Sequence, residues 1–174
     1  MNNKDLDRLS KYYSDSIESY QKKSDQRRQS VEDMIKNTME SLVYISKIID
    51  NNNQENNFDG VVEVYENEIQ YRMNDKLLKV SIQDNHTSAL LLIQGTIVDY
   101  DPDNSFNYKE INNTNINKKL YMKIDDTTKG IEYVDGNKDI YYTNFSMMKY
   151  ILNIIATLSI FGYDTPVSET KAEE

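Results

Sequence analysis

The sequence predicts an α+β protein with a helical amino-terminal arm, a curved antiparallel sheet of about five to seven strands, and a carboxy-terminal helix packed on the sheet. One observation behind this fold is that no glycine precedes Gly60 and no proline precedes Pro102, so the opening of the 174-residue chain lacks the residues that most often interrupt a helix. After Gly60, apolar residues alternate with polar ones, which is the period of strands. The most apolar segment, 147–161, then predicts a buried closing helix.

The helical arm is assigned to residues 1–57. Its first half carries apolar side chains at spacings of three and four residues, and these five residues are called the first stripe: Leu6, Leu9, Tyr13, Ile17 and Tyr20. Residues 21–30 offer nothing to bury, so they form either a solvated helix or a break between two helices. If the chain breaks there, the Ser30 hydroxyl can cap a new helix by accepting from the Asp33 amide.

The second half of the arm carries a denser apolar face, and its principal residues are called the second stripe: Val31, Ile35, Leu42, Ile45 and Ile49. Periodicity shows which side of a helix is covered but not what covers it. We expect the second stripe to form a homodimer, with folding back onto the sheet as the alternative. Residues 50–57 are nearly all Asn with Gln and Glu, which predicts a helix stop and a linker.

Residues 58–163 are assigned to the sheet and the closing helix. Alternating residues predict strands around 62–64, 69–71 and 78–82, joined by short polar turns at 66–67 and 74–75. The most apolar strand, 88–99, should lie centrally in the sheet, with a bulge or bend at Gly95. A strand over 120–124 is followed by a hairpin that turns at 135–137. Asn144 or Ser146 is expected to cap the closing helix, and residues 164–174 are expected to be a disordered tail.

Composition excludes several classes of function. The formal charge of −9 argues against a protein that coats phosphate backbones. The absence of cysteine rules out disulfides, thiolate metal sites and cysteine nucleophiles. His86 is the single histidine, and no nucleophile or partner for it is evident, so we expect no enzyme activity. The amino terminus has no apolar signal-peptide core and no segment is long enough to cross a membrane, so a cytoplasmic location is expected.

One acidic segment has the oxygen-donor spacing of a calcium loop. Asp99, Asp101, Asp103 and Glu110 occupy its first, third, fifth and twelfth places. The pattern departs from the EF-hand at the sixth place, where Asn104 replaces glycine, and the preceding residues predict a strand instead of a helix. The segment is therefore interpreted as a turn between two strands, with no cofactor expected and a calcium-binding protein or metal-dependent enzyme as the alternative.

The acidic chain contains one basic cluster, formed by Lys22, Lys23, Arg27 and Arg28. On a helix, Lys23 and Arg27 share a face and could contact nucleic acid. The favoured interpretation is a solvated helix face, because four charges bind phosphate weakly at physiological salt.

These observations favour a small acidic protein-binding or regulatory protein, an inhibitor or adaptor that acts by occupying a macromolecular partner. The negative charge would attract a basic partner, such as a nucleic-acid-handling protein. The alternative is a nucleic-acid-binding accessory protein that uses the Lys22–Arg28 face.

Overall fold

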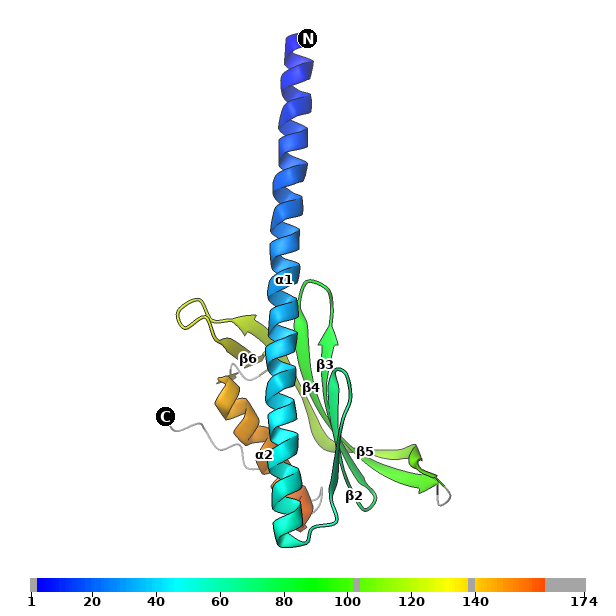
Figure 1. Ribbon diagram of the computed structural model, residues 1–174. Helices are drawn as coiled ribbons and strands as arrows, with labels where there is room; N and C mark the ends of the chain where they lie inside the picture. The colour runs from blue at the N-terminus through cyan, green and yellow to red at the C-terminus, as the bar shows by residue number, and fades with distance from the viewer. Residues whose placement is uncertain (1–2, 102–103, 138–139, 162–174) are drawn as a thin grey trace.

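The computed structural model describes residues 3–101, 104–137 and 140–161, and it confirms the predicted α+β fold. A long helix α1 (Asn3–Asn56) and a shorter helix α2 (Asn144–Phe161) lie on one face of a seven-stranded sheet (Figure 1). The strands are β1 (Val61–Val64), β2 (Glu68–Met73), β3 (Lys76–Asp84), β4 (Ala89–Asp101), β5 (Asn104–Ile124), β6 (Ile131–Asp135) and β7 (Ile140–Tyr142).

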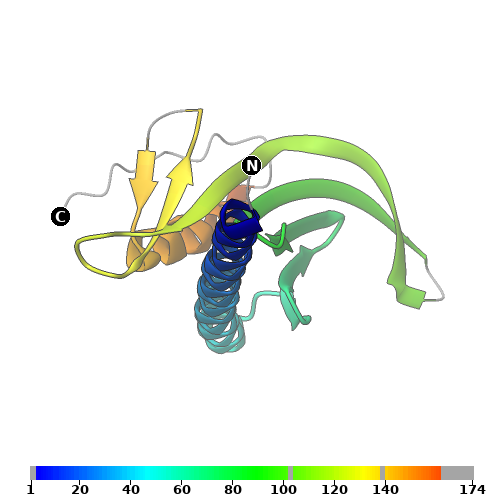
Figure 2. The same cartoon turned by 90° about the horizontal axis from the view of Figure 1, so that it is seen from above.

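The sheet is an antiparallel meander in which each strand pairs with the next along the chain. The apolar strand β4 lies in the middle, as predicted, and the hairpin of β6 and β7 is also confirmed. The register between β4 and β5 shifts at Gly95, where the Thr114 hydroxyl donates to the Gly95 carbonyl at 2.8 Å. β4 and β5 curve strongly along their length (Figure 2).

Helix α1 is continuous, so the predicted alternative of a break over 21–30 is wrong. Gln, Lys and Arg, which fill this segment, are good helix formers even without an apolar face. The Ser30 hydroxyl does not cap a new helix but donates to the Gln26 carbonyl one turn earlier. The helix also passes through most of the expected linker and ends at Asn56. The next residue, Asn57, has a φ of +54°, and the Phe58 amide donates to the Asn53 carbonyl, as in a Schellman cap.

The second stripe packs on the chain's own sheet, which corrects the expectation of a dimer seam there. Val31, Leu42, Ile45 and Ile49 are buried and Ile35 is half-buried in a single core cluster. The cluster also contains inward-facing residues of β2 to β7 and the apolar face of α2. The alternative in which the arm folds back onto the sheet is therefore the observed one, because the curved sheet supplies the apolar surface that the stripe needs.

Helix α2 begins at Asn144, but its cap is Thr143 instead of the predicted Asn144 or Ser146. The Thr143 hydroxyl accepts from the Ser146 amide at 3.2 Å. Asn144 is engaged elsewhere, because its side-chain amide donates to the Ser41 hydroxyl on α1 at 2.9 Å. Its carbonyl oxygen also accepts from the Tyr133 hydroxyl at 3.3 Å. This polar network joins α1, β6 and α2.

Tyr133 predicts a loss of stability in alkaline solution. Burial raises the pKa of its phenol to about 12, against the smaller opposing effect of the hydrogen bond with Thr38. Because the pKa is higher in the folded chain than in the unfolded chain, the neutral phenol stabilises the fold below about pH 10. This contribution, about 3 kcal/mol, is lost as the pH rises from about 10 to 12.

The measurement is urea denaturation of the wild type and of Tyr133→Phe near neutral pH and at about pH 12. Near neutral pH the variant should be less stable by about 1 to 2 kcal/mol, because Thr38 and Asn144 lose a buried partner. In alkali the difference should shrink or reverse. An equal difference at both pH values would contradict the predicted titration.

Candidate protein-binding surfaces

The first half of α1 projects beyond the sheet as an isolated helix (Figure 1). Residues 3–26 are called the projecting segment, and at about 1.5 Å per residue they extend about 36 Å. From Lys4 to Arg27, all residues are exposed except Asp5 and Ser16, which are half-buried. The five side chains of the first stripe lie on this segment, between 48% and 70% exposed. Large apolar side chains gathered on one face of an exposed helix indicate an association surface.

The two arginines of the basic cluster attach α1 to the body where the projecting segment begins. Arg28 donates from two nitrogens to both carboxylate oxygens of Asp84, at 2.8 and 2.9 Å, and from Nε to Glu32 at 2.8 Å. Arg27 donates to the Thr87 carbonyl at 3.1 Å. Hydrogen bonding to Arg28 lowers the pKa of Asp84, and hydrogen bonds with Asp84 and then Glu32 raise the pKa of Arg28. Arg27 and Arg28 therefore hold the turn between β3 and β4 instead of forming an open basic face.

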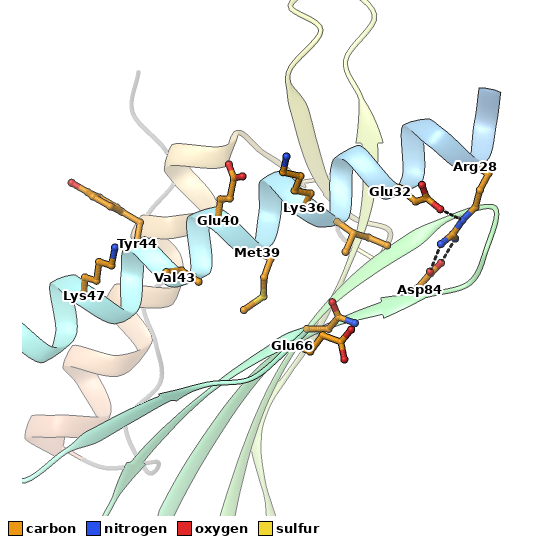
Figure 3. A pocket seen from close by; sticks show the side chains of 12 residues that line it. Arg28, Glu32, Lys36, Met39, Glu40, Val43, Tyr44, Lys47, Glu66 and Asp84 are labelled. Atoms are coloured by element: carbon orange, nitrogen blue, oxygen red, sulfur yellow. Dashed lines mark hydrogen bonds and ion pairs between the residues drawn. The ribbon is translucent and has the colours of Figure 1, made fainter. Parts of the chain in front are cut away.

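A groove of about 630 Å³ runs along the flank of α1 that lies opposite α2 (Figure 3). Ile35, Met39 and Val43 form its apolar floor, and Met39 points into the space between the helix and the sheet. All three floor residues are half-buried. Glu66 and Asn67, in the turn between β1 and β2, form the opposite wall. The groove exists because α2 covers only one flank of α1.

The rim of the groove is charged and comes mainly from the outer side of α1. Lys36, Glu40 and Lys47 project there together with Tyr44, whose side chain is 59% exposed. The ion pair of Arg28 with Asp84 closes one end. An apolar floor with a polar rim and an aromatic side chain beside it is the arrangement found in protein interfaces. The groove runs along α1 and is not an enclosed cavity of the kind that holds a small molecule.

The acidic segment of the proposed calcium loop lies in the hairpin of β4 and β5. Asp99 pairs with Lys109, and Glu110 pairs with Val98, so the backbone runs in two extended arms instead of winding around one ion. Asp101 ends β4 and Asp103 lies outside the described residues, as do the side chains of 99–113. Among the side chains that the structure does describe, no group of three or more His, Cys, Asp or Glu residues gathers as metal ligands would.

A buried ion pair between β5 and β6 was not found by sequence reasoning. Lys118 Nζ lies 3.1 Å from Asp135 Oδ2, and the two side chains are only 10% and 7% exposed. Lys118 also donates to the Tyr142 hydroxyl at 3.1 Å and lies over the Tyr150 ring. Lys118 lies on the same inward face of β5 as Ile116, Leu120 and Met122, because these residues are two apart along the strand. This spacing is the signal in the sequence that could have placed Lys118 in the core. The pair lines neither the groove nor the projecting segment.

His86 lies in the turn between β3 and β4, where its φ of +67° and its backbone contacts shape the turn. Its amide donates to Asp84 and its carbonyl accepts from Arg28. Within the ranges that the structure describes, no helix has the length and apolarity needed to cross a bilayer. Comparison of the chain with protein-family models, curated proteins and solved structures finds no match.

Proposed function

We propose that this chain is a cytoplasmic, non-enzymatic protein-binding protein that acts as an inhibitor or adaptor by holding a segment of another protein in the groove beside α1. The observation that carries the proposal is the uncovered flank of α1. On the opposite flank α2 completes the core, whereas neither described helix covers Ile35, Met39 and Val43 on the groove side, and these residues stay half-buried. A partner helix with an apolar face would cover the floor as α2 covers the other side.

The charge of the chain favours a basic partner. A net charge of −9 attracts cationic proteins at long range and accelerates their encounter. The carboxylates of Glu40 and Glu66 stand at the groove itself and would meet basic residues flanking the apolar face of the bound segment. A nucleic-acid-handling protein is one class that presents such segments.

Direct binding of nucleic acid is less favoured than protein binding. Arg27 and Arg28 are committed to the β3–β4 turn, which leaves Lys22 and Lys23 from the basic cluster. Two lysines in an acidic chain give little phosphate affinity at physiological salt.

The groove is tested with a matched pair of valine substitutions. Val43→Glu places a charge on the groove floor, and Val61→Glu makes the same change on the edge strand β1, where Val61 is 47% exposed. A pull-down from the native cell with the wild type and with Val61→Glu should recover the same specific protein. Val43→Glu should reduce its affinity by about tenfold to a hundredfold, because a desolvated contact at an interface centre is replaced by a carboxylate.

Thermal unfolding of all three proteins serves as the control for folding. Similar melting temperatures with selective loss of binding in Val43→Glu would support the groove. Recovery of no specific protein by the wild type, or equal binding by Val43→Glu, would contradict the proposed function.

A further inference from the structure

We propose that the first stripe is covered by the first stripe of a second copy of this chain, in an antiparallel helix pair centred on Tyr13. The proposal concerns the projecting segment and is independent of the groove. It moves self-association from the second stripe, which the sheet covers, to the first stripe, whose side chains stand in solvent.

The spacing of apolar residues in the first stripe is symmetric about Tyr13. Leu9 and Ile17 stand four residues to either side of it, and Leu6 and Tyr20 stand seven residues to either side. At about 100° per residue, all five side chains lie within about 40° of Tyr13 around the helix. Two antiparallel copies related by a two-fold axis beside Tyr13 therefore place Leu9 against Ile17 and Leu6 against Tyr20 of the second copy.

The flanks of the stripe suit the same arrangement. Ser10, Ser14 and Ser16 lie beside its centre and bring no charge there. Asp5 and Lys23 lie about 80° from Tyr13 on the same side of the helix. In the antiparallel pair, Asp5 of each copy falls within about two residues, or 3 Å of axial rise, of Lys23 in the other, which places opposite charges together.

The position of the sheet selects the antiparallel direction. Tyr13, Val31 and Ile49 are spaced by eighteen residues, which is five full turns, so the two stripes occupy one face of α1. A parallel partner on that face would run into the sheet that covers Val31 and Ile49. An antiparallel partner centred on Tyr13 brings its Asn3 opposite Lys23. The paired residues 3–23 of both copies therefore lie on the amino-terminal side of Arg27, where the β3–β4 turn meets α1.

Mass measurement by light scattering or sedimentation tests self-association. The wild type should have twice the chain mass of 20.4 kDa. Ile17→Glu should raise the dimer dissociation constant about a hundredfold, because symmetry introduces the change twice against Leu9. Gln26→Glu adds the same charge on the far side of the helix and should remain a dimer. A wild type that stays monomeric up to about 100 µM, or an Ile17→Glu that dimerises like the wild type, would overturn the proposal.

The direction of the pair is read from cross-links, which the cysteine-free chain makes simple. Leu9→Cys and Ile17→Cys are prepared separately and treated with a short thiol cross-linker alone and mixed. An antiparallel pair gives covalent dimers efficiently only in the mixture. Covalent dimers from each variant alone would show a parallel pair and overturn the proposed arrangement. Neither readout depends on capture of another protein, so failure here leaves the groove experiment intact.

Discussion

Leu42→Ala is expected to lower the free energy of unfolding by about 3 kcal/mol, within the range of 2 to 5 kcal/mol found for buried leucines. Leu42 has no exposed surface and lies where α1 meets the sheet and α2. Removing its branched end leaves a cavity that rigid strands on one side and a helix on the other cannot fill. Urea denaturation of the wild type and the variant measures the difference.

Leu42→Asp should leave the chain largely unfolded, because an ionised carboxylate at this position has no partner and no access to water. Tyr44→Ala, two residues along the same helix, is the control. Tyr44 is 59% exposed, so its removal should change stability by well under 1 kcal/mol. If Leu42→Asp folds with near-native stability, the second stripe is not covered by the sheet.

Asp135→Asn is expected to destabilise the fold by about 3 to 5 kcal/mol, because it removes the buried carboxylate that lies 3.1 Å from the ammonium of Lys118. Burial alone would lower the pKa of Lys118, but the hydrogen bond with Tyr142, the nearby Tyr150 and the hydrogen bond with Asp135 together raise it. A raised pKa in the folded chain means that the charged lysine stabilises the fold below its ordinary pKa of about 10.4 and that this contribution is lost as pH rises further. The effect of Asp135→Asn should therefore be present throughout neutral pH.

The double variant Lys118→Met with Asp135→Asn separates the ion pair from simple disruption of the site. Met fills the space of the lysine stem without a charge, so the double variant should recover most of the stability that Asp135→Asn loses. Denaturation curves of the two single variants and the double variant give the coupling free energy directly. A double variant less stable than Asp135→Asn would contradict the loss of the buried charge pair as the cause of the destabilisation.

The two wrong predictions about α1 have different causes. The segment 21–30 has no apolar side chain, so it shows no hydrophobic period, yet its backbone stays helical because most of its residues are Gln, Lys and Arg, which are good helix formers. The Asn-rich segment after Asp50 also stays helical, because Ile49 and Asn53 hold it against the body. In 21–30 the missing apolar period hid a segment whose residues favour helix, whereas in the Asn-rich segment contacts with the body outweighed the local preference for a linker.

The sequence by itself determined the fold class, the central place of β4, the bulge at Gly95 and the hairpin of β6 and β7. These follow from periodicity and turn residues, which act over a few positions of the chain. Only the tertiary structure decided that the sheet covers the second stripe, that Arg28 forms an ion pair with Asp84, and that Lys118 is buried beside Asp135. The physical reason is that a repeating pattern shows which side of an element avoids water, whereas the groups that cover that side come from residues far away in the chain.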